Sequence, residues 1–165
     1  MYARKENNEI VKYNKLPKIF DAAKDEHITL TADNCGAYGF KPLVQPTYNS
    51  RTHQRTTEII ADGENYTYKV ESRGKTLDEL KSELRRELKG YWKTAFNEGK
   101  PYSDYLKATD QTMPTDVETK INTLYGLLGT IKAQIAALST VEDAGNYTFP
   151  MNDINEGLEY LRDLI

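Results

Sequence analysis

Residues 117–138, VETKINTLYGLLGTIKAQIAAL, carry an almost unbroken heptad pattern of apolar side chains. Such a pattern places the apolar residues on one narrow stripe of a helix, and that stripe must be buried against another helix. A helix is therefore expected over about residues 115–139. Its packing seam consists of Val117, Ile121, Leu124, Leu128, Ile131, Ile135 and Leu138.

A second long helix is predicted before this one. Thr76 followed by Glu79 forms a capping box, and leucines and aromatic residues recur at helical spacing from there to Phe96. Because Gly and Pro follow at positions 99 and 101, the helix is expected to span about residues 76–97 and to be followed by a loop over residues 99–113.

The end of the chain predicts a turn and a short helix. Asp143–Asn146 has turn composition, and apolar residues then recur at helical spacing over about residues 152–164. Gly126 and Gly129 interrupt the heptad helix, where a glycine costs about 1 kcal/mol relative to alanine. They suggest that another backbone approaches closely at this point.

The first 73 residues are typical of strands and turns. A hairpin is expected over residues 1–13, because Asn7 and Asn8 tolerate the left-handed backbone of a tight turn. A second hairpin is expected where Asp62-Gly63 separates strands over residues 56–61 and 66–70.

Two segments of this region are harder to assign. Residues 38–44 contain Pro42, which lacks a donor, so they are expected to form an edge strand or the end of a strand. Residues 28–31 fit either a brief strand or the lead-in to a helical turn. Together the patterns predict an α+β fold, with a small antiparallel β unit over residues 1–73 and a helical hairpin or coiled-coil-like unit over residues 74–165.

Composition excludes several classes of protein. The net charge of −3 gives no electrostatic case for binding nucleic acid or anionic membranes. The basic stripe Lys81, Arg85, Lys89 and Lys93 lies beside an acidic one, so an ion-paired, solvated helix face is expected there. Met1–Glu6 lacks the apolar segment of a signal peptide, and no apolar run approaches membrane-spanning length, so synthesis in the cytoplasm is expected.

No pattern of catalytic or metal-binding residues stands out. Cys35 is the only cysteine, and neither His27 nor His53 lies near it in the sequence, so a buried structural cysteine is expected. Phosphate-binding glycine loops are absent from the sequence, and the acidic turns do not match a calcium loop. The chain is therefore expected to be non-enzymatic, without cofactor or metal, and carbohydrate binding is not expected.

The heptad seam allows two interpretations. In one, the helix over residues 76–97 packs on the seam within a single chain. In the other, several chains share the seam as a parallel stem, and mixed Ile and Leu at the seam positions permits a homotrimer without demanding it. The sequence leaves both open.

The first half of the chain contains a distinctive phrase, residues 38–44 (YGFKPLV) with Pro46, Tyr48-Asn49, Thr52 and Gln54 after them. Three shorter phrases accompany it: residues 16–20 (LPKIF), residues 66–70 (YTYKV) and residues 76–80 (TLDEL). With these phrases, about residues 1–90 resemble small tail and tail-fibre-associated proteins of tailed bacteriophages.

The resemblance implies a structural protein of the phage virion, made in the host cytoplasm, that joins or decorates a tail fibre or baseplate. Its partners would be other phage tail proteins. The alternative is a tail-fibre assembly chaperone that is absent from the mature virion. The β unit would supply the docking surface, for which the candidates are Tyr38, Phe40, Tyr48, Tyr66 and Tyr68.

Overall fold

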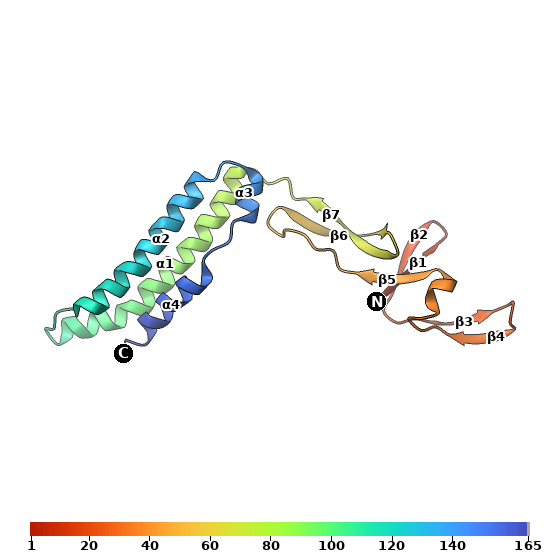
Figure 1. The fold of residues 1–165 in the computed structure, drawn as a ribbon, viewed down its shortest axis with the longest axis horizontal. Coiled ribbons are helices and arrows are strands. Elements are labelled where there is room, and N and C mark those ends of the chain that lie inside the picture. Colours follow the sequence, from red (N-terminus) through yellow and green to blue (C-terminus); the bar gives the residue numbers. More distant parts are fainter. Residues whose placement is uncertain (165) are drawn as a thin grey trace. The chain divides into compact units, whose positions relative to one another are not determined.

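The computed structural model describes residues 1–164, and the chain divides into a β unit and a helical unit between Arg73 and Gly74. The fold is α+β, as the sequence predicts (Figure 1). The β unit contains a mixed five-stranded sheet and a separate two-stranded hairpin, and the helical unit contains four helices.

The first hairpin is confirmed. Strands β1 (Tyr2–Glu6) and β2 (Glu9–Tyr13) pair antiparallel, with Tyr2 opposite Tyr13. Asn7 and Asn8 have φ angles of 47° and 70°, the left-handed backbone for which asparagine is suited.

The segment that the sequence left open contains both predicted features. Strands β3 (Lys18–Asp21) and β4 (Glu26–Thr29) form the separate hairpin, and the short 3₁₀ helix η1 (Cys35–Tyr38) follows. Between them the Asn34 side chain accepts a hydrogen bond from the backbone N–H of Thr31, at 2.7 Å. The strand and the helical turn are therefore consecutive rather than alternatives.

The main sheet is mixed: β5 and β7 pair in parallel, and the other strand pairs are antiparallel, in keeping with the predicted mainly antiparallel unit. Its strand order is β2-β1-β5-β7-β6, with β5 (Phe40–Val44), β6 (His53–Asp62) and β7 (Asn65–Ser72). After β5 the chain leaves the neighbouring position in the sheet open and forms β6 at the edge of the sheet. A tight turn at Gly63 then places β7 between β5 and β6, where it runs antiparallel to β6 and parallel to β5.

Strand β5 is central in the sheet and not an edge strand. Its first half pairs with β1, where Pro42 lies opposite Tyr2, and its second half pairs with β7 from Leu43 onward. The N–H of Leu43 points towards β1 and donates to the Met1 carbonyl at 3.0 Å. Neighbouring N–H groups alternate in direction along a strand, so the missing donor of Pro42 falls on the β7 side, before that ladder begins.

Helix α1 (Leu77–Ala108) begins as predicted but continues past the predicted end at about Asn97. At its start, the Glu79 side chain accepts from the Thr76 N–H at 2.8 Å, and the Thr76 hydroxyl accepts from the Glu79 N–H at 3.3 Å. Pro101 lies inside the helix, where it removes the hydrogen bond to the carbonyl four residues earlier and its ring crowds that carbonyl. Burial of Leu106 beyond it favours continuation, so most of the predicted loop is helical.

Three further helices complete the helical unit. Helix α2 (Thr115–Ala137) matches the predicted heptad helix, and α4 (Met151–Arg162) lies close to the predicted last helix. The predicted turn at Asp143–Asn146 is instead part of the short helix α3 (Val141–Asn146). It forms because the Thr140 hydroxyl accepts from the Asp143 N–H at 3.0 Å and caps its first turn.

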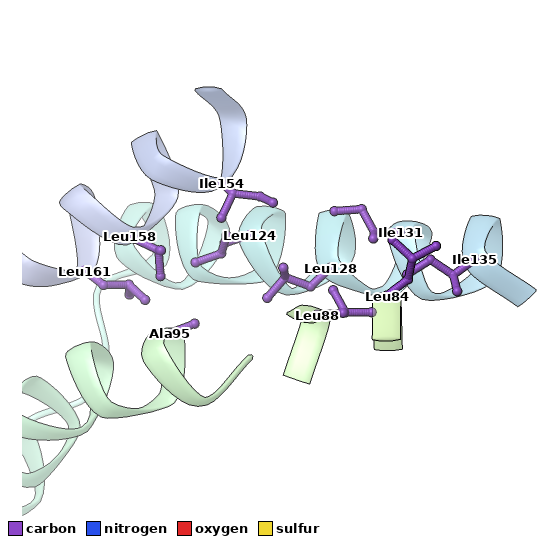
Figure 2. Close-up of a cluster of buried hydrophobic side chains, with 10 residues drawn as sticks. All are labelled: Leu84, Leu88, Ala95, Leu124, Leu128, Ile131, Ile135, Ile154, Leu158 and Leu161. Carbon is purple, nitrogen blue, oxygen red and sulfur yellow. The ribbon is translucent and has the colours of Figure 1, made fainter. Parts of the chain in front are cut away.

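Helices α1 and α2 run in opposite directions and α4 lies alongside both (Figure 1). Side chains from all three helices meet in one buried cluster (Figure 2). Helices α1 and α2 thus form the predicted helical hairpin, and α4 completes a three-helix bundle with them. The cluster contains Leu84, Leu88, Ala95, Leu124, Leu128, Ile131, Ile135, Ile154, Leu158 and Leu161.

The glycine that permits close packing is Gly157 in α4. A Cβ atom there would lie 2.8 Å from Cδ1 and 3.2 Å from Cβ of Leu124, so α4 approaches α2 through this glycine. At Gly126 and Gly129 a Cβ would meet nothing within 4 Å, so the predicted close approach at those positions is wrong within this chain.

Gly157→Ala should destabilise the helical unit by about 1–3 kcal/mol, because overpacking outweighs the better helix propensity of alanine. Gly129→Ala is the matched control, and should stabilise the unit by about 0.5–1 kcal/mol because its Cβ enters open space. Urea unfolding of both variants checks the two signs. Equal stabilisation by both would contradict the packing described here.

The capping box should make α1 sensitive to acid. Hydrogen bonds from the backbone N–H and hydroxyl of Thr76 lower the pKa of Glu79 below its usual value of 4.5. Its stabilising contribution is therefore complete above that usual value and is lost as the pH falls through the lowered pKa. The melting temperatures of the wild type and Glu79→Gln should differ near neutral pH and converge in acid, whereas a constant difference would argue against the cap.

Candidate interaction surfaces

The residues considered for catalysis have structural surroundings. Cys35 is 3% exposed and packs beside Leu30 and Phe40. The His27 ring contacts Phe20 edge to face, and a His53 ring nitrogen lies 2.9 Å from the Thr52 hydroxyl. Within residues 1–164, no three His, Cys, Asp or Glu side chains gather where they could hold a metal ion.

Three of the five candidate docking residues on the β unit are buried. Phe40, Tyr66 and Tyr68 are 1%, 7% and 7% exposed, because the sheet buries them in its two apolar clusters. Tyr38 is half-buried, and its hydroxyl donates to Asp21 at 2.9 Å, which lowers the pKa of that carboxyl. Only Tyr48 has the exposure that a docking residue needs, at 38%.

The heptad seam of α2 is buried inside the bundle. Five of its residues belong to the core, and Ile121 and Leu138 pack against its edge. In this fold the seam is therefore occupied by α1 and α4 of the same chain, and its side chains do not face solvent as an intermolecular stem would require. The buried members are Val117, Leu124, Leu128, Ile131 and Ile135.

Two charged residues of the basic and acidic stripes on α1 interact with other parts of the chain. Lys81 donates to the Ala136 carbonyl at 2.9 Å, close to the C-terminus of α2, where a cation also complements the helix dipole. Glu83, from the acidic stripe, pairs with Lys75 at 2.7 Å. Lys81 and Glu83 therefore each interact with a residue outside the two stripes.

The sequence places Phe96 among the buried residues of α1, but its side chain is 60% exposed. It stands at the edge of a groove of about 340 Å³ between α1 and α2. Gly99, Ile121, Tyr125 and Leu161 also line this groove. On the rim Lys100 bonds to Asp104 and lowers the pKa of that carboxyl. An aromatic side chain this exposed is a candidate contact point.

A second groove runs between α2 and α4 and has a volume of about 370 Å³. Leu124, Leu127 and Gly157 give it apolar walls. Its charged lining residues are Lys120, Asp153 and Glu156. Periodicity along α2 could not reveal this groove, because it depends on how closely α4 approaches.

No similar protein indicates what these surfaces bind. Comparison with known protein families, with curated sequences and with solved structures finds no match to this chain. Over the described part of the chain, none of the helices combines the length and apolar character that crossing a membrane requires. The surfaces themselves and the resemblance in the first half of the sequence are therefore what indicate a function.

Leu128→Asp should abolish the fold of the helical unit, because Leu128 is 0% exposed between its neighbours. Truncating a buried leucine to alanine already costs about 2–5 kcal/mol, and a buried carboxylate adds to that cost. Thr130→Asp, at an exposed position of the same helix, is the matched control. Circular dichroism should show helix loss only for Leu128→Asp, and a fully helical variant would refute the intrachain seam.

Proposed function

We propose that this chain is a non-enzymatic structural protein of a bacteriophage tail, an adaptor that joins or decorates a tail fibre or baseplate. The assignment to a phage rests on the resemblance of about residues 1–90 to small tail-associated proteins. The role in assembly rests on the helical unit, and above all on the exposure of Phe96 beside an apolar groove. Its partners would be other tail proteins, and its location the virion.

The surface of the helical unit has the composition of a protein–protein interface. The two grooves of the helical unit combine apolar walls with a few charged side chains. Protein interfaces use this combination, in which aromatic anchors provide affinity and rim charges select the partner. In the β unit Tyr48 offers a further exposed aromatic side chain.

A second candidate function is a tail-fibre assembly chaperone that leaves before the virion is complete. The same exposed Phe96 favours it, because a chaperone must present apolar surface to an unfinished partner. The two candidates differ in whether the protein stays in the particle.

Deleting the gene from the phage that encodes it tests both roles. An adaptor should be present in purified wild-type particles in a fixed ratio to other tail proteins, and particles without it should lack a tail component in electron micrographs. Mass spectrometry of the purified particles provides the ratio. If deletion particles lack fibres and this protein is absent from wild-type particles, it is the chaperone. Deletion particles identical to the wild type would overturn both proposals.

A further inference from the structure

The exposed Phe96 lies on a cationic face of α1. Lys93 and Lys100 are three residues before it and four residues after it, and this spacing places all three side chains on the same side of the helix. Lys100 also pairs with Asp104, so the face has two ammonium groups and one carboxylate around the aromatic ring. Among residues 1–164 no ion pair involves Lys93.

The α2–α4 groove has the opposite charge. Asp153 and Glu156 lie on the α4 side and Lys120 on the α2 side, so two carboxylates outnumber one ammonium group. Its volume of about 370 Å³ exceeds the cavity of about 150 Å³ that holds a benzene molecule, so a phenyl ring can enter. Leu124 and Leu127 offer apolar contact to such a ring.

We propose that the chain binds a second copy of itself head to tail, with Phe96 of one copy in the α2–α4 groove of the next. The apolar ring then meets the apolar walls of the groove, and Lys93 and Lys100 face Asp153 and Glu156, so the charges are complementary as well. The occupant is a copy of this chain because one helical unit carries both halves of the contact. This inference goes beyond the proposed function, since it does not depend on a phage origin.

The two halves are different patches, so the contact is heterologous. An open assembly has a free Phe96 at one end and a free groove at the other, so it either closes as a ring or continues as a filament. A contact centred on one aromatic side chain and a few charges is small, so association should depend on concentration and weaken with added salt.

The test uses the full chain and light scattering after size exclusion, over a wide concentration range. The wild type should exceed the monomer mass and grow with concentration. Phe96→Asp, which lacks the ring, and the double variant Asp153→Lys with Glu156→Lys, which lacks the acidic rim, should each be monomeric. Mixed in equal amounts, they should form a dimer and nothing larger, because one supplies the groove and the other supplies Phe96.

Matched controls separate this contact from others. Tyr105 is a second exposed aromatic residue on α1, at 52%, and Tyr105→Asp should associate like the wild type. Circular dichroism should show all variants folded, because every changed side chain is exposed. A wild type that is monomeric throughout would overturn the proposal. So would a mixture that stays monomeric, or a rim variant that still dimerises, since the latter would indicate a symmetric contact through Phe96.

Discussion

Burial of the α2 seam is the constraint on which the helical unit depends. The seam presents large aliphatic side chains along the whole helix, and one partner helix covers only part of such a stripe. Helix α1 covers one side of it and α4 covers part of the other, with Leu128 fully buried where the three helices meet and Ile135 buried beside Leu84 of α1 (Figure 2). Gly157 lets α4 come close enough to do so. Without either α1 or α4, apolar side chains of the seam would be exposed to water.

The surfaces of the helical unit follow from this arrangement. Because α4 must insert its apolar side between the other helices, its acidic residues are left at the border with α2, where they edge a groove. Because α1 turns its leucines inward, the ring of Phe96 and the lysines around it remain on the outside. The charges that select a partner are thus placed by the packing of the core, and the two oppositely charged faces belong to one unit.

Much of the fold could be predicted from local patterns, and the errors have physical causes. The hairpin at Asn7-Asn8, the capping box of Thr76 and the heptad helix all depend on neighbouring residues. The strand order does not depend on neighbouring residues alone. Sequence periodicity therefore reveals neither the central position of β5 nor its parallel pairing with β7. Gly99 and Pro101 predict the end of the helix near Asn97, but α1 continues past Pro101 and buries Leu106 beyond it.

The candidate sites were less predictable than the fold, because exposure depends on tertiary packing. Aromatic residues in strands suit both a core and a docking surface, and Phe40, Tyr66 and Tyr68 turned out to be core. Phe96 has the spacing of a buried residue, yet it lies at the border of the apolar stripe, where periodicity alone is ambiguous. The α2–α4 groove depends on how the two helices are positioned relative to each other, and periodicity within either helix does not specify that.

The staggered pairing of β5 has a consequence for how the chain folds. The sheet is complete only when residues near position 2 meet residues near position 42, and when β7 has entered beside β5. Ordering such long loops costs entropy before any contact is gained, whereas the helices of the bundle gain most of their contacts from nearby residues. The β unit leaves the ribosome before the helical unit, but its sheet should be the slower of the two to reach its native state.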